Sequence, residues 1–150
     1  MGDDIRSRLV SVALEWQKRF GVAPAVTSAI SEFDAFSLVG MSEEEYCTDC
    51  IERTAVTSGH DFKHNGCRYQ IKANRPSGKP GSPVRLVGKA KNLAWDKLIW
   101  ILYDRDYCIQ EAWEWTVEEY RTQFEFAKRL APTDMRKGRR IYPAPGLQES

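Results

Sequence analysis

Three polar residues within residues 59–72 have the types and the spacing that metal-dependent hydrolysis of a phosphodiester needs. The dipeptide Asn65-Gly66 predicts a two-residue type I′ turn, because both residues tolerate a positive φ. Pairing outward from this turn places Asp61 opposite Gln70, with Cβ atoms about 4.5–5.5 Å apart and Lys72 on the same face. Two side-chain oxygens could then ligate one Mg²⁺ or Mn²⁺, beside a lysine that orients or deprotonates water.

The opposite face of the same hairpin is suited to a hydrophobic core. It carries Phe62, Cys67, Tyr69 and Ile71, which alternate with the polar set. The alternative interpretation is a solvent-facing hairpin with alternating charges, although this gives no structural reason for a glutamine facing an aspartate.

Short motifs follow one another in a set order over about residues 28–120. They are Ser31-Glu32, Gly59-His60-Asp61, Asn65-Gly66, Tyr69-Gln70-Ile71-Lys72 and Asp104-Arg105-Asp106-Tyr107. This order resembles that of the PD-(D/E)XK nuclease superfamily, in particular small restriction-endonuclease-like bacterial proteins. The resemblance implies a mixed sheet flanked by helices, a DNA substrate and a homodimer that cuts both strands.

The resemblance also implies a role for each matching residue. Asp61 and Gln70 would ligate the metal through side-chain oxygens, and Ile71 would offer its backbone carbonyl. Lys72 would be the catalytic lysine, and Glu32 an indirect or second-metal ligand. His60 replaces the family's proline. Gln70 replaces a carboxylate, which removes one negative charge and should weaken metal affinity.

Basic residues are concentrated in one segment, although the formal net charge of the chain is only +1. The residues between Asp61 and Asp96 include no acidic residue. We expect phosphate contacts from this segment, with Arg85 as the first candidate, although a solvated basic loop is the alternative. The candidates are Arg75, Lys79, Arg85, Lys89 and Lys91. A second basic cluster at 136–140 belongs to a predicted C-terminal tail, basic and then rich in Pro and Gly, over 132–150.

Hydrophobic periodicity and capping residues predict the elements that position these side chains. Helices are expected over 4–20, from Thr27 or Ser28 to Gly40, from Ser42 to about Arg53, and from Thr116 to about Leu130. Strands are expected in the hairpin, over the apolar run 98–103, which should be buried on both faces, and over 107–115. The first helix carries an apolar stripe of Ile5, Leu9, Val12, Ala13, Trp16 and Phe20.

The element order predicts one α/β (α+β) domain over 1–150. We expect a restriction-endonuclease-like, mixed and mostly antiparallel central sheet flanked by helices. The chain has no apolar run near the roughly 20 residues of a membrane helix, no secretory leader and only four cysteines. These features predict a cytoplasmic protein without a membrane partner.

Two further features have alternative interpretations. Cys47 and Cys50, followed by His60 and His64, could form a small structural zinc site rather than remain free thiols. Trp95 lies in a Lys/Asn-rich segment and is a candidate for stacking on a base, whereas the other tryptophans suit the core.

The expected function is a Mg²⁺-dependent or Mn²⁺-dependent endodeoxyribonuclease. The alternative is a catalytically inactive nucleic-acid-binding or protein-interaction domain of the same fold, such as an accessory protein of a phage or mobile element.

Overall fold

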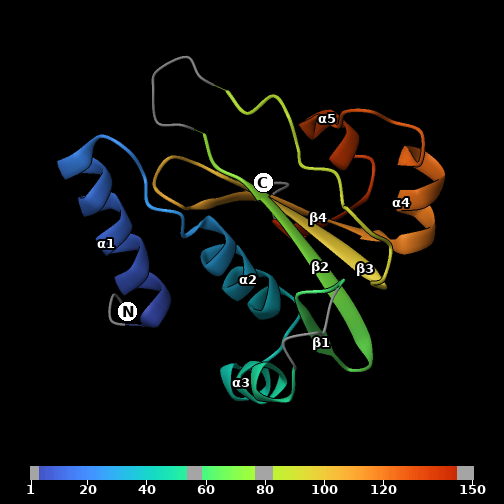
Figure 1. Cartoon of the computed structure of the whole chain (residues 1–150), viewed down its shortest axis with the longest axis horizontal. Helices are drawn as coiled ribbons and strands as arrows, with labels where there is room; N and C mark the ends of the chain where they lie inside the picture. The colour runs from blue at the N-terminus through green and yellow to red at the C-terminus, as the bar shows by residue number, and fades with distance from the viewer. Residues whose placement is uncertain (1–3, 54–58, 77–82, 145–150) are drawn as a thin grey trace.

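A five-stranded sheet lies at the centre of the computed structural model, which describes residues 4–53, 59–76 and 83–144 (Figure 1). The strands are β1 (Phe62–His64), β2 (Cys67–Asn74), β3 (Lys97–Tyr103), β4 (Ile109–Thr116) and β5 (Arg139–Tyr142). They are ordered β1-β2-β3-β4-β5. Strands β2 and β3 are parallel, and the other neighbouring pairs are antiparallel. The predicted mixed, mostly antiparallel sheet flanked by helices is therefore confirmed.

Helices cover both faces of the sheet (Figure 1). Those in the described residues are α1 (Ile5–Phe20), α2 (Thr27–Leu38), α3 (Glu43–Glu52), α4 (Val117–Phe124) and α5 (Pro132–Met135). Local signals define several of their ends. Ser42 and Thr116 form capping boxes with Glu45 and Glu119, as the sequence predicts, and Gly21 ends α1 at a φ of 80°.

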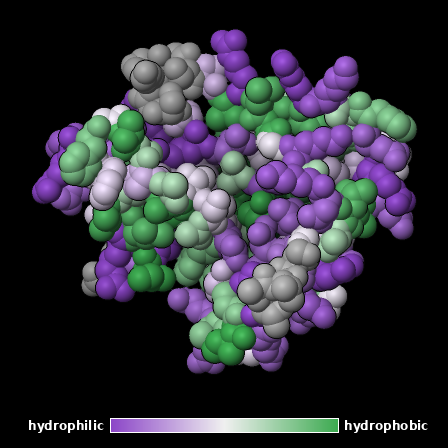
Figure 2. Space-filling model, viewed as in Figure 1, coloured by the Kyte–Doolittle hydropathy of each residue, from purple (hydrophilic) through white to green (hydrophobic). Residues whose placement is uncertain are grey.

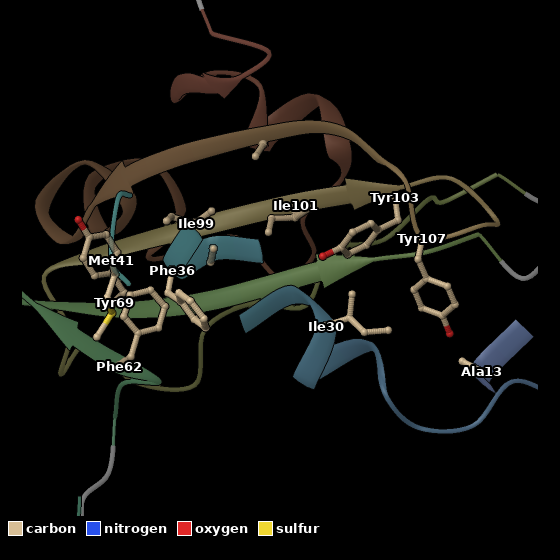
Figure 3. Packing of buried hydrophobic residues seen from close by; sticks show 12 residues of the cluster. Ala13, Ile30, Phe36, Met41, Phe62, Tyr69, Ile99, Ile101, Tyr103 and Tyr107 are labelled. Carbon is tan, nitrogen blue, oxygen red and sulfur yellow. The ribbon is translucent and has the colours of Figure 1, made fainter. Parts of the chain in front are cut away.

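Two hydrophobic clusters, one on each face of the sheet, form the core. Residues of α1 and α2, including Ile30 and Phe36, pack against Phe62, Tyr69 and Ile99 (Figure 3). On the other face, α4, α5 and the segment before β3 pack against Leu98 and Trp100. Strand β3 thus buries side chains on both faces, as its continuous apolar run predicts.

Asn65-Gly66 forms the predicted tight turn of the hairpin. Asn65 has a φ of 51° and Gly66 a φ of 77°, the positive values that a type I′ turn requires. The register is also as predicted, with His64 opposite Cys67 and Phe62 opposite Tyr69. The ladder stops at Phe62, so Asp61 is not paired directly with Gln70 as expected.

The C-terminal region differs from the prediction. Helix α4 ends at Phe124 rather than near Leu130, because Leu130 forms a β-bridge with Val87 and so leaves the helical path. Residues 132–144 are not a tail, since they contain α5 and then β5, which pairs with β4. Pairing with β4 supplies the backbone hydrogen bonds of β5, a long-range effect that its short, charged sequence does not reveal.

The burial of two predicted features also differs. Trp95 is only 1% exposed and packs in the second core, so it is not free to stack on a base. On α1, Ala13 is buried, but Ile5, Val12, Trp16 and Phe20 remain exposed. None of the helices in the described residues is long and apolar enough to cross a bilayer.

Candidate metal centre

One pocket brings together all the residues that the sequence assigns to metal binding and catalysis. It has a volume of about 340 Å³ and lies between α2, the start of β1 and the exposed edge of β2. Its lining residues are Thr27, Ser28, Ser31, Glu32, Asp61, Gln70, Ile71, Lys72 and Ala73. The short β1 leaves this part of β2 unpaired on one side, which creates the space.

Asp61 is oriented by backbone hydrogen bonds to β2. Its N–H donates to the carbonyl of Tyr69 at 2.7 Å, and its Oδ2 accepts from the N–H of Ile71 at 2.7 Å. The carboxylate therefore lies along the edge of β2 rather than over Gln70. Among the described residues, no hydrogen-bond donor contacts the other carboxylate oxygen, Oδ1.

The same bond orients the backbone of Ile71. The N–H and C=O groups of one strand residue point to the same edge of the strand. The Ile71 carbonyl consequently faces the edge at which Asp61 lies, where it can act as an oxygen ligand. Gln70 and Lys72 lie opposite Leu98 and Trp100 on β3, on alternate positions of the same strand.

Glu32 enters the pocket from α2 and is held by two neighbours. The Tyr46 hydroxyl donates to Oε1 at 2.5 Å, and Arg53 Nη2 lies 3.6 Å from the same oxygen. Burial raises the pKa of the Glu32 carboxyl above its ordinary value, the Tyr46 hydrogen bond opposes this, and the charge of Asp61 raises it further. Burial is thus the main cause of the raised pKa of Glu32, and the nearby Asp61 carboxylate adds to it.

Arg53 connects the two acidic residues of the pocket. Its Nη1 donates to the backbone carbonyl of Asp61, its Nε lies 3.3 Å from Asp49 Oδ2, and its guanidinium lies over the Tyr46 ring at 5.8 Å. Tyr46 and Arg53 were not predicted from the sequence. Their positions within α3 and at its C-terminal cap give no sign that they reach α2 and the segment before β1.

Gly59 of the Gly-His-Asp motif is required by a close contact beside the site. It has a φ of 92°, and a Cβ at this position would lie 2.6 Å from the Cβ of Ala94. A side chain would therefore push the segment leading into Asp61 away from the loop that precedes β3.

Three hydroxyl residues in the pocket were also not predicted. Thr27, Ser28 and Ser31 lie in the first turns of α2 and line the pocket with Glu32. Ser28 precedes Glu32 by four residues, and Thr27 precedes Ser31 by four, so each pair lies on one side of the helix. The first N–H groups of a helix lack intrahelical partners and carry partial positive charge. The pocket thus combines oxygen ligands with a helix end that suits an anion.

The donor set fits a hard divalent cation, although its negative charge is small. No group of three or more His, Cys, Asp or Glu side chains among the described residues is placed to hold a metal ion. Two carboxylates line the pocket, those of Glu32 and Asp61. The Gln70 amide, the Ile71 carbonyl and water would complete the oxygen shell, as Mg²⁺ commonly requires.

The residues predicted to contact phosphates differ in their surroundings. Arg75 donates to the Arg105 carbonyl and to Gln17 and lies 4.1 Å from the centre of the Tyr107 ring, while Lys89 donates to the carbonyls of Glu125 and Ala127. These bonds give Arg75 and Lys89 structural roles. Arg85 and Lys91 are exposed, and Lys79 lies outside the described residues.

The second basic cluster is largely neutralised within the fold. Arg136 forms two hydrogen bonds with Glu111, at 2.6 and 3.0 Å, and Arg139 binds the buried Glu114 at 2.5 Å. Lys137 lies 3.7 Å from Asp134. The bonds of Arg136 and Arg139 hold the segment of α5 and β5 to β4, whereas the Lys137 pair is local.

The cysteines of the alternative zinc site are exposed on α3. Arg53 donates to Cys50 Sγ at 2.9 Å, and His64 Nδ1 lies 3.1 Å from Glu45 Oε2.

Comparison with known proteins adds no identity to this geometry. The chain matches no protein-family model and no curated protein.

Proposed function

We propose that this chain is a metal-dependent endodeoxyribonuclease of the PD-(D/E)XK type. The observation that carries the proposal is the convergence of Glu32, Asp61, Gln70, Ile71 and Lys72 on one pocket. These residues come from three separate elements, and hydrolysis of a phosphodiester uses oxygen ligands and a lysine in this combination.

The residues have separable roles in this proposal. Asp61, Gln70 and the Ile71 carbonyl would hold Mg²⁺ or Mn²⁺, with Glu32 as a further ligand directly or through water. When bound, the cation would supply charge neutralisation and lower the pKa of a ligated water. Lys72 would orient the attacking water, accept its proton where the lysine is neutral, and stabilise negative charge on the phosphate when protonated.

The DNA backbone would approach the pocket from its open side. The first turn of α2, with Thr27 and Ser28, offers N–H and hydroxyl donors to a phosphate. Arg85 and Lys91 are exposed cations that could contact phosphates farther along the strand. Such contacts position DNA without reading its sequence.

A DNA-binding domain without cleavage activity is the second candidate. The observation that favours it is the engagement of Glu32 by Tyr46 and Arg53 together with an amide at Gln70. With Glu32 held in this way, Asp61 would be the main charged ligand, and the cation affinity would fall.

Plasmid cleavage tests the first candidate. Supercoiled plasmid is incubated with the protein in Mg²⁺, Mn²⁺ or EDTA, alongside Lys72→Ala and Asp61→Asn. Lys128→Ala, a change at an exposed lysine outside the pocket, is the matched control. We expect metal-dependent nicking that both pocket variants lose and the control keeps.

Other results would support different functions. Retardation of plasmid without cleavage, weakening steeply as salt is raised, would support the DNA-binding candidate. Cleavage that survives Lys72→Ala would rule out this centre. Neither cleavage nor retardation would reject both candidates and favour a protein-interaction domain.

A further inference from the structure

An apolar stripe on α1 faces away from the hydrophobic core. The exposed fractions are 54% for Ile5, 58% for Val12, 47% for Trp16 and 61% for Phe20, and Val22 just beyond the helix is 64% exposed. Trp16 and Phe20 also contact one another, with ring centres 4.9 Å apart. Figure 2 shows apolar side chains gathered on the surface over α1, at the left of the view.

The stripe is exposed because a different face of α1 already anchors the helix. Leu9, Ala13 and Leu14 pack on the first core. Arg6 donates to both carboxylate oxygens of the buried Asp34, at 2.6 and 2.9 Å. The helix is therefore firmly oriented, and its exposed apolar stripe has a fixed direction relative to the sheet.

We propose that a second copy of this chain covers the stripe, with the two α1 helices packed antiparallel about a two-fold axis. In such a pair, Ile5 would pack against the partner's Trp16, and Leu9, which the core covers only in part, would pack against the partner's Val12. This arrangement is self-complementary, as a two-fold interface must be. The proposed dimer is inferred from the surface of α1 alone and does not depend on the proposed nuclease activity.

Charge on one flank of the stripe favours the antiparallel arrangement. Arg8 and Glu15 are seven residues apart, so they lie on the same flank two helical turns from each other. Antiparallel packing places Arg8 near the partner's Glu15, and the symmetry repeats this pair. Parallel packing about a two-fold axis would instead place this flank against the partner's opposite flank, so Arg8 would not meet the partner's Glu15. Glu15 now binds Arg19 at 3.0 Å, and this exposed pair can rearrange at little cost.

The available area fits a weak, concentration-dependent dimer. Stable interfaces bury about 800 Å² on each partner, with an apolar centre and a polar rim. Ile5, Val12 and Trp16, which this register brings against the partner's α1 and which are each about half exposed, offer roughly 300 Å² of apolar surface at about 200 Å² for a whole side chain. The flanking Arg8, Glu15 and Arg19 would supply much of the remaining rim.

Light scattering after size exclusion, with sedimentation equilibrium for the dissociation constant, tests the proposal on the full chain. We expect a concentration-dependent dimer that Trp16→Glu weakens about thirtyfold or more. Phe126→Ser is the matched control, because Phe126 is 90% exposed and lies outside α1. Circular dichroism checks that each variant keeps its fold.

Charge exchange tests the orientation of the helices. Arg8→Glu and Glu15→Arg should each weaken the dimer, and their mixture should form a heterodimer because every flank pair is again of opposite charge. The double variant should dimerise with itself as the unmodified chain does.

Several results would overturn the proposal. A monomer at concentrations up to about 1 mM would show that a second copy does not cover the stripe and would leave it to a different protein. A dimer that Trp16→Glu does not weaken, or that Phe126→Ser weakens equally, would place the interface elsewhere. If Arg8→Glu and Glu15→Arg each weaken the dimer but their mixture forms no heterodimer, the antiparallel pairing is rejected.

Discussion

Substitution of Asp61 separates the structural role of this residue from its proposed chemical role. Its Oδ2 accepts a 2.7 Å hydrogen bond from the N–H of Ile71 at the unpaired edge of β2. In Asp61→Ala, this N–H loses its partner, whereas in Asp61→Asn the amide oxygen can still accept the bond. Both variants remove the negative charge that a divalent cation would require.

The expected loss of stability follows from the type of bond. A hydrogen bond to a charged group contributes about 1.5–3 kcal/mol, and partial exposure of this site favours the lower end. Asp61→Ala should therefore lower the free energy of unfolding by about 1.5–2 kcal/mol, or Tm by roughly 3–8 °C for a domain of this size. Asp61→Asn should lose less than about half of that.

Three measurements made in parallel check this expectation. Thermal unfolding in EDTA, followed by circular dichroism, gives the change in stability without bound metal. Titration calorimetry with Mn²⁺ measures cation binding and plasmid cleavage measures activity, and both variants should lose both. If Asp61→Asn were as unstable as Asp61→Ala, the bond to Ile71 would not be the source of the stability. If Asp61→Asn kept Mn²⁺ binding, Asp61 would not be a cation ligand.

Three other predictions concern stability. Asp34→Ala should lower the free energy of unfolding, measured by chemical denaturation, by about 3–5 kcal/mol. The substitution leaves two groups without their partner, the Arg6 charge and the Tyr103 hydroxyl, which lies 2.6 Å from Asp34 Oδ2. A loss below about 1 kcal/mol would contradict this. Gly59→Ala should lower stability by about 2 kcal/mol or more, whereas Gly88→Ala, where a Cβ meets nothing within 4 Å, should be nearly neutral; equal effects would exclude the contact with Ala94 as the cause. Burial opposes ionisation of Glu111, but its hydrogen bonds to Arg136 and Trp113 outweigh burial and lower its pKa. The stability that Glu111 contributes is therefore present above its ordinary pKa of 4.5 and is lost as the pH falls through the lower folded value. Glu111→Gln should accordingly be less stable than the unmodified chain at pH 7 by about 0.5–1 kcal/mol and nearly equal to it near pH 3, and a pH-independent difference would refute the role of ionisation.

Signals confined to a few residues account for the features that were predicted correctly. Asn65-Gly66 determines the hairpin and its register because few residues adopt positive φ without strain. Ser42 and Thr116 determine where α3 and α4 begin through bonds to residues three positions along. The register in turn placed Gln70 and Lys72 on one strand and Asp61 near them, so most of the pocket was predictable.

The sequence by itself therefore determined the hairpin, most helix starts and the grouping of Asp61, Gln70 and Lys72, because each depends on local conformation or on alternation along a strand. The family resemblance added the mixed sheet, Glu32 and Ile71 to the prediction. Tertiary structure alone decided how the Asp61 carboxylate bonds to Ile71 and that Tyr46 and Arg53 engage Glu32. It also decided that 139–142 form a strand on β4, and that Ile5, Val12, Trp16 and Phe20 stay outside the core. These outcomes depend on which segments far apart in the chain pack together. Local periodicity shows that a helix has an apolar face, but it does not show which residues of that face the core will cover.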